Sequence, residues 1–315
     1  MLNRRNLRVK VLETLYAYSV SDDKEIKKFE KQLLKNVELV DQMYIWTLNL
    51  LDEAAGYVTI DAESRANKFI PDERDKIYTT KLDSNTFIES LRRNKTYLER
   101  VKRYKVDWSF DPEIVRVIFS KLKDTEEYLD YLKNEDRSID SEKNIIRYIF
   151  RQIILKTPEI DQSFEALFLH WVTDKEVLKA MIAKTFKNFS SENPSENRLV
   201  EITPNWEEDR NFVIQLLQQT IRYEHEYQNL ISENSKNWDS DRLALMDTLI
   251  MRMALVEFEH FFEIPIKVTL NEYIDLAKQY STHKSGVFVN GILNKILVDF
   301  REQGRVNKHG RGLIG

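Results

Sequence analysis

The sequence predicts an all-α protein with room for one large or two ordinary domains. Apolar residues recur at helical spacing from the N-terminus to about residue 300. Glycine and proline are scarce, with 7 glycines and 6 prolines in 315 residues, so the sequence predicts few turns and few strand ends. Because 42% of the residues are hydrophobic, the chain can bury a sizeable core and should be globular.

The residues that most enzymes use for chemistry are absent or dispersed. The chain has no cysteine, which excludes a disulfide framework, a thiolate nucleophile and a cysteine metal site. Neither the dinucleotide-binding GxGxxG pattern nor a P-loop pattern occurs, which argues against a nucleotide site of either kind. The five histidines are scattered, with no HExxH motif. We therefore expect no catalytic residue, metal or cofactor, and predict that the protein is not an enzyme.

Hydropathy and net charge limit where the protein is expected in the cell and which partners it is expected to bind. No apolar run approaches the roughly 20 residues of a membrane helix, so we expect a soluble cytoplasmic protein without a membrane segment. The formal net charge of −4 argues against indiscriminate binding of nucleic acid. Local basic patches are still compatible with that charge.

The N-terminal segment predicts an amphipathic helix with an unusual charge pattern. An apolar stripe follows four cations with no acid among them, Arg4, Arg5, Arg8 and Lys10. Cations at a helix N-terminus oppose the macrodipole and cost about 0.3 to 1 kcal/mol each at low salt. Two interpretations stay open: a solvated arginine cluster at a frayed terminus, or a patch that binds phosphate.

The next segments predict long helices. Apolar residues from Ile26 to Ala55 are spaced by threes and fours in an eleven-residue repeat, which indicates a nearly straight helix of about 45 Å if it is continuous. Residues 84–108 predict another helix with Leu98 among its inward positions. Its outer face is basic and carries Arg92, Arg93, Lys95, Arg100, Lys102, Arg103 and Lys105. Packing against acidic neighbours is favoured over RNA binding there.

Further helices follow as far as a polar boundary at 190–205. Asp111 with Pro112 begins one that should reach about Lys133, the next covers 141–156, another starts at Glu159, and Asp174 is expected to cap the last. The polar stretch 190–205 contains two prolines and marks the clearest domain boundary.

The C-terminal third carries strong helix signals. Asn205 and Glu208 have capping-box spacing before a helix to about Ser235. A deeply buried helix follows from about residue 238, and Thr269 and Glu272 predict a second capping box after it. Ser285 is expected to cap the last helix, whose inner positions are Val289, Ile292, Ile296 and Phe300. The tail 303–315 is basic and glycine-rich, and should be flexible.

These C-terminal helices also resemble a known family. KVTLNEYIDLAKQY followed by SGVFVNGILNKI resembles the C-terminal half of the NusB family of bacterial antitermination factors. DRLALMDTLIMRMALVEF is similar to the preceding helix of that family, and RRNLRVKVLETLY to its arginine-rich first helix. The resemblance implies a NusB-like helical bundle core with a large all-helical insertion. The implied domains are 1–20, the first helix of the core; 21–205, the insertion; 206–302, the rest of the core; and 303–315, the basic flexible tail.

The resemblance also implies a function in transcription antitermination. A NusB-like factor would bind a boxA-like single-stranded element of nascent ribosomal RNA together with the ribosomal protein NusE, and join an antitermination complex on RNA polymerase. Position by position, the implied RNA-binding residues are Arg4, Arg5, Arg8, Lys284, Phe288 and Asn290. The implied partner-binding residues are Tyr16, Asp241 and Asp247. Val287 departs from the family pattern, which often has a lysine or arginine there, and the two aspartates replace expected glutamates.

Two other functions are alternatives to this one, an RNA-modifying enzyme and a protein-binding scaffold. NusB-like domains also precede RNA cytosine methyltransferases, but this chain lacks both an α/β cofactor domain and the cysteine nucleophile. The remaining alternative is a helical protein-protein scaffold in which the insertion is the binding module.

Overall fold

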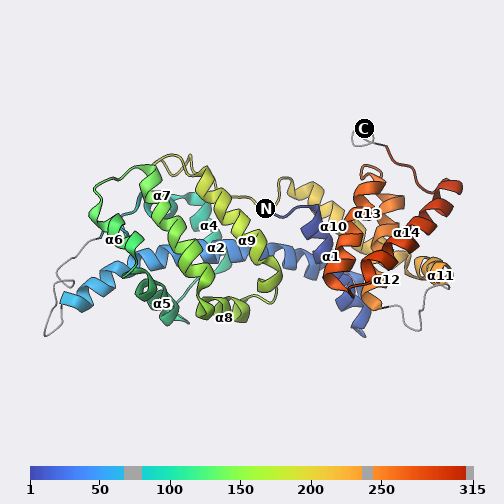
Figure 1. The fold of residues 1–315 in the computed structure, drawn as a ribbon, viewed down its shortest axis with the longest axis horizontal. Helices are drawn as coiled ribbons and strands as arrows, with labels where there is room; N and C mark the ends of the chain where they lie inside the picture. Colours follow the sequence, from blue (N-terminus) through green and yellow to red (C-terminus); the bar gives the residue numbers. More distant parts are fainter. Residues whose placement is uncertain (67–79, 236–243, 310–315) are drawn as a thin grey trace. The chain divides into compact units, whose positions relative to one another are not determined.

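The computed structural model describes residues 1–66, 80–235 and 244–309 (Figure 1). Over these ranges the chain forms fourteen α-helices, one π-helical turn and one 3-10 turn, with no strand, which confirms the all-α prediction. The chain divides into two compact units: unit 1 comprises Met1 with 38–204, and unit 2 comprises 2–37 with 205–315. None of the described helices combines the length and the apolar character needed to cross a bilayer.

Unit 2 is built around one buried helix. Its elements are α1 (Arg4–Val20), the start of α2 (Ile26–Ala66), α10 (Trp206–Arg222), α11 (Glu224–Ser235), α12 (Leu245–His260), α13 (Ile266–Tyr280) and α14 (Ser285–Glu302). Helix α12 contacts α1, α10, α11, α13 and α14, and twelve consecutive residues of it, 247–258, are buried. This confirms the predicted buried helix and explains its lack of a polar face.

The predicted helix starts in unit 2 are partly right. The Asn205 side chain accepts the Glu208 amide at 3.3 Å and caps α10, as expected, but α10 ends at Arg222 and α11 begins at Glu224. The capping box at Thr269 is wrong, because α13 begins earlier, at Ile266, directly after Pro265. The Thr269 hydroxyl instead donates to a buried carboxylate, that of Glu257, at 2.7 Å.

Unit 1 holds the remaining helices. They are the rest of α2, then α3 (Thr86–Arg93), α4 (Lys95–Tyr104), α5 (Pro112–Leu122), α6 (Glu126–Lys133), α7 (Ile139–Tyr148), α8 (Pro158–Leu167) and α9 (Trp171–Asn188). A π-helical turn (Ile149–Ile153) and a 3-10 turn (Ile154–Lys156) extend α7. Helix α2 is continuous, as its apolar repeat predicts.

Two helices predicted as single are broken by side-chain caps. Asn94 accepts the Tyr97 amide at 3.1 Å and starts α4, and Thr125 starts α6 in the same way. The break at Asn94 buries Tyr97 and leaves Leu98 48% exposed, so the inward position predicted for Leu98 is wrong. Asp174 does not cap α9 either, because the helix already begins at Trp171.

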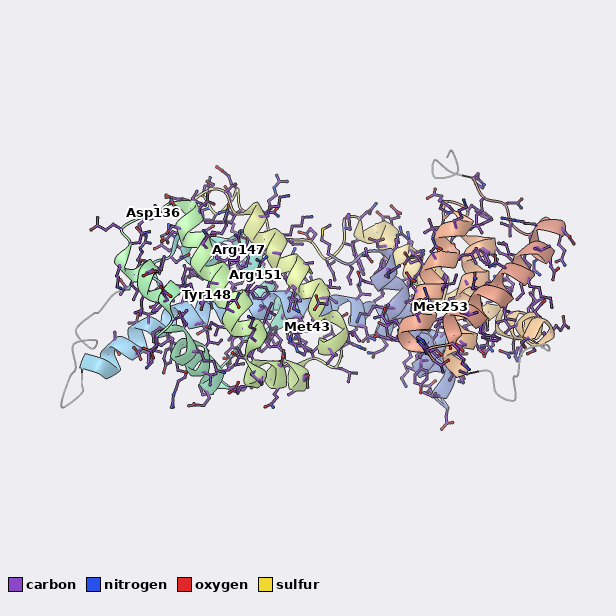
Figure 2. The ribbon with its side chains drawn as sticks, in the orientation of Figure 1. Met43, Asp136, Arg147, Tyr148, Arg151 and Met253 are labelled. Carbon is purple, nitrogen blue, oxygen red and sulfur yellow. The ribbon has the colours of Figure 1, made fainter. Side chains whose placement is uncertain are left out.

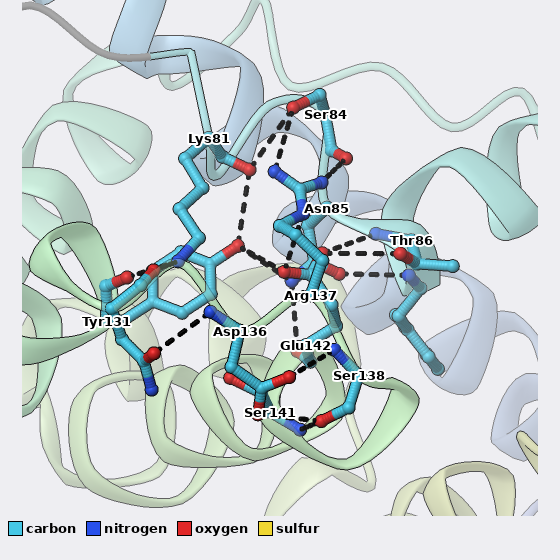
Figure 3. Close-up of polar contacts among 12 residues, drawn as sticks. Lys81, Ser84, Asn85, Thr86, Tyr131, Asp136, Arg137, Ser138, Ser141 and Glu142 are labelled. Carbon is cyan, nitrogen blue, oxygen red and sulfur yellow. Dashed lines mark hydrogen bonds and ion pairs between the residues drawn. The ribbon is translucent and has the colours of Figure 1, made fainter.

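A cluster of polar side chains joins α3, α6 and α7 in unit 1 (Figure 3). The fully buried carboxylate of Glu142 accepts the Thr86 amide at 2.8 Å and the Tyr131 hydroxyl at 3.1 Å. Arg137 lies 3.1 Å from the same carboxylate, and Asn85 donates to the Glu142 carbonyl at 2.9 Å. The carboxylate therefore serves as a second cap for α3 and fixes α3 to α6 and α7.

Candidate nucleic-acid interface

The first turn of α1 presents the N-terminal arginines from an ordered start. Asn3 caps the helix by accepting the Asn6 amide at 3.0 Å, and the Asn6 side chain accepts the Asn3 amide at 3.1 Å. This reciprocal cap satisfies orphan amides of the first turn. It excludes the frayed terminus that was one of the two interpretations of the arginine cluster.

Acids within unit 2 offset the cations that the helix dipole disfavours. The Arg4 Nε lies 3.0 Å from Asp209, the Arg4 Nη2 contacts Glu208, and the guanidinium lies 4.4 Å from the centre of the Phe212 ring. Arg5 donates from Nε and Nη2 to Glu272, at 2.9 and 3.1 Å. The side chains of Arg4 and Arg5 are 33% and 45% exposed. Each side chain is therefore partly accessible at the surface.

Arg8 differs from its two neighbours because it is buried. Its side chain is 3% exposed and donates from Nε and Nη2 to both oxygens of Glu257, at 2.9 and 2.8 Å. Burial alone lowers the pKa of Arg8, but the hydrogen bonds and charge of Glu257 outweigh it and raise that pKa. Thr269 and Tyr273 donate to the same carboxylate, so Glu257 joins α1 to α12 and α13.

A cleft of about 950 Å³ opens beside these arginines within unit 2. Its lining comes from α1, α10, α13, the turn after α12 and the C-terminal tail. Amide side chains at Asn3, Asn211 and Gln215 share it with the aromatic rings of Phe212 and Phe262. The cleft therefore combines hydrogen-bonding amides, aromatic surface and guanidinium groups.

The second predicted group of RNA-binding residues lies at the start of α14. Lys284 is the N-cap residue and is exposed, Phe288 is half-buried, and Asn290 is exposed and accepts from Asn294 at 2.7 Å. Ser285, the predicted cap, is instead the first residue of the helix. It is buried, and its hydroxyl donates to Asp247 at 2.8 Å.

That contact changes the interpretation of Asp247. We predicted a partner-facing carboxylate, but the side chain is buried beneath the 282–285 turn and holds the start of α14. Its position fits a structural role, whereas Tyr16 is exposed on α1, as a partner contact requires. Asp241 lies outside the described residues.

Helix α13 connects the two predicted RNA-binding groups. Arg5 contacts Glu272 and Asp275, and Lys278 lies one turn further along the same face, with its Nζ 3.4 Å from Asp275. A Cβ added to Gly286 of α14 would lie 2.8 Å from the Lys278 side chain. The face of α13 therefore brings Arg5 and the start of α14 onto one surface, and Lys278 joins the candidate site. The i,i+3 spacing from Asp275 could have indicated Lys278, but only with the Arg5 contact known.

Comparison with known proteins identifies this region. Residues 176–298 match the model of the NusB family. A transcription antitermination protein NusB from Salinibacter ruber is 44% identical over 106 residues, which cover 34% of this chain and 66% of that protein. NusB of Chloroherpeton thalassium is 35% identical over 105 residues, 33% of this chain and 50% of the relative. This part of the chain matches the NusB family.

The similarity to NusB proteins covers only part of this chain and only part of each relative. NusB of Acetivibrio thermocellus is 36% identical over 91 residues, covering 29% of this chain and 63% of its own length. The chain thus spans about two thirds or less of the NusB proteins it matches. No solved structure matches. The family match begins within α9, ahead of the predicted core at 206, and does not include α1.

The tail after the NusB-family match is more ordered than its composition suggests. Arg305 pairs with Glu226 and Glu259, and Lys308 donates to the carbonyls of Glu257 and Phe261 at 2.7 and 2.8 Å. Flexibility predicted from residue 303 onward therefore does not hold for 303–309, and 310–315 lie outside the described residues. The lysine satisfies carbonyls at the C-terminus of α12, which composition alone does not reveal.

Proposed function

We propose that the protein is a non-enzymatic transcription antitermination factor. In this proposal it binds a boxA-like element of nascent ribosomal RNA together with the ribosomal protein NusE, within a cytoplasmic antitermination complex on RNA polymerase. The observation that carries the proposal is the surface along α13, which joins Arg5 at the start of α1 to Lys278 and the start of α14. It lies in the unit that contains most of the NusB-family match.

The roles of the predicted residues follow from their exposure. Arg4 and Arg5 contact phosphates through the exposed parts of their guanidinium groups, and Lys278 and Lys284 add charge. Phe288 offers a ring edge and Asn290 an amide to an unstacked base. Arg8 acts indirectly, because its buried pair with Glu257 fixes the rotation of α1.

The partner-facing role is assigned to the exposed side of α1. Tyr16 lies three turns from the arginines, so it can contact a protein while the helix start contacts RNA. Binding of NusE at Tyr16 predicts that Tyr16→Ala weakens the NusE complex but leaves binding of RNA alone unchanged. Equal loss of both interactions would contradict this assignment.

A salt series tests the RNA contacts. Each lost phosphate contact should lower the slope of log K against log salt by about 0.7, so Arg4→Ala/Arg5→Ala should lower it by up to about 1.4. The matched control is Lys295→Ala/Arg301→Ala, which removes two exposed charges from the outer face of α14. A slope that falls equally in both variants would contradict site-specific contacts.

A second function, a protein-binding scaffold, is supported by one observation in unit 1. Leu169, just before α9, and Val172, in its first turn, are 88% and 73% exposed, although both side chains are apolar. In this case Leu169→Asp/Val172→Asp would abolish assembly with the transcription complex while RNA binding persists. Unchanged assembly would exclude this surface.

A further inference from the structure

The cations of unit 1 fall into two groups that differ in their partners. On α3 and α4, Arg92 pairs with Asp52 and Asp83 at 2.6 and 2.8 Å, and Arg100 with Asp41 and Glu201 at 3.1 and 2.8 Å. This confirms the acidic packing favoured for that face. Arg93 and Arg103 also have carboxylate partners. The four arginines of the predicted basic face are therefore paired with acids, which weakens their field. Its three lysines, Lys95, Lys102 and Lys105, are exposed, with no ion pair found to a described residue.

The cations of α7 and α9 are not neutralised in this way. From 139 to 156 and over α9, 171–188, there are eight cations, Lys143, Arg147, Arg151, Lys156, Lys175, Lys179, Lys184 and Lys187. The same segments carry four acids, of which Glu142, in the cluster of Figure 3, and Asp174 are buried, leaving Asp140 and Glu176 near the surface. Those two pair with Lys143 and Lys179.

Three of these cations are free of acidic partners among the residues that the structure describes. Arg147 donates only to the neutral side chain of Asn144, at 3.3 Å. Arg151 and Lys187 are exposed, and no hydrogen bond or ion pair to another described residue is found for either. These three cations add positive charge to a chain whose formal net charge is −4.

Packing places the two helices side by side. The rings of Phe150 and Phe186 lie 6.1 Å apart, and Lys143 near the start of α7 reaches the Phe189 carbonyl after the end of α9, at 3.5 Å. The helices therefore run antiparallel, with Arg147 and Arg151 flanking Phe150 in sequence and Lys187 next to Phe186. Figure 2 shows Arg147 and Arg151 close together on the stretch of unit 1 where α7 lies beside α9.

The shape of this α7–α9 face indicates the kind of ligand. At 1.5 Å per residue, Lys143 to Lys156 extends over roughly 20 Å, which is too long for a single phosphate or nucleotide. An extended polyanion can contact such a row at several points and release its counterions. Arginine is suited to phosphate because its planar fork can bind two oxygens at once.

We propose that the α7–α9 face binds the backbone of single-stranded RNA outside the boxA-like element. This inference rests on the proposed function, which brings nascent RNA to the protein through unit 2. The face adds affinity without reading sequence, because phosphate contacts carry no base information. It gives the insertion a role in RNA binding.

The test compares two RNAs and two variants by fluorescence anisotropy. One RNA is a boxA-like 12-mer, and the other is a 40-mer with the same element at its centre. The variant Arg147→Ala/Arg151→Ala/Lys187→Ala removes three unpaired cations. The matched control, Arg93→Ala/Arg103→Ala/Arg116→Ala, removes three exposed arginines that have carboxylate partners in unit 1.

The intact protein and the control should bind the 40-mer at least tenfold more tightly than the 12-mer. The α7–α9 variant should lose most of this advantage, with a salt slope lower by up to about 2 on the 40-mer and unchanged on the 12-mer. If both variants lose this affinity advantage equally, or if neither loses it, the inference is overturned, while the proposed function still stands. The result in which neither variant loses the advantage is also expected if the face binds an acidic protein. If the intact protein binds neither RNA, both proposals fail.

Discussion

Removing one partner of the buried Arg8–Glu257 pair should destabilise unit 2 more than removing both. Glu257 is fully buried and accepts two hydrogen bonds from Arg8, so Arg8→Met leaves a buried carboxylate without its cation. The expected cost of that change is about 3 to 5 kcal/mol, and Glu257→Leu should cost a similar amount. The double variant should cost no more than either single one, because no unpaired charge remains. The coupling energy then has a magnitude of at least about 3 kcal/mol.

Hydrogen exchange in α1 and α12, followed through a urea series, measures this coupling locally. A local measurement is needed because a chain with two units need not unfold in one transition. Arg92→Met in unit 1 is the control: its side chain is 36% exposed, so its pair with Asp52 should contribute about 1 kcal/mol or less. Additive costs for Arg8→Met and Glu257→Leu would refute the role assigned to the buried pair.

Three further predictions concern the tail and the helix ends. Burial lowers the pKa of Lys308 from 10.5 to about 8, so between these two pH values the unfolded chain binds a proton that the folded chain does not. The stability of the intact protein relative to Lys308→Met should therefore rise as the pH rises from about 8 to 10.5. A difference in thermal unfolding that stays constant over this pH range would contradict the prediction. Asn94→Ala removes the cap of α4 and a hydrogen bond to the Asn197 carbonyl at 2.9 Å, which should cost about 2 kcal/mol in urea unfolding, whereas a loss below about 0.5 kcal/mol would count against it. Gly286→Ala places a Cβ 2.8 Å from the Lys278 side chain and should cost about 1 to 3 kcal/mol, and an unchanged melting temperature would show that the Lys278 side chain moves aside at little cost.

Periodicity predicted the elements of this fold better than their ends. The apolar repeat from Ile26 correctly indicated one continuous helix, because apolar residues recur at the helical period over its predicted length. The breaks at Asn94 and Thr125 were missed because each depends on a single side chain that caps the next helix. Such a residue is also tolerated within a helix, so spacing alone does not distinguish the two cases.

The sequence indicated which residues form the candidate site better than it indicated the role of each one. The arginines of α1 were singled out correctly as needing favourable partners, but their acids, Asp209, Glu257 and Glu272, lie more than 200 residues away in the chain. Local pattern cannot show which of them is buried. For the same reason, the capping-box spacing of Thr269 was misleading, since its hydroxyl serves a buried carboxylate.

The measurement that tests the proposed function most directly is the affinity of the intact protein for a boxA-like RNA and for a scrambled RNA of equal length and composition, with and without NusE. The account predicts at least tenfold tighter binding of the boxA-like RNA, and a further gain when NusE is present. Equal affinity for the two RNAs under both conditions would contradict it, because phosphate contacts alone would then explain all binding.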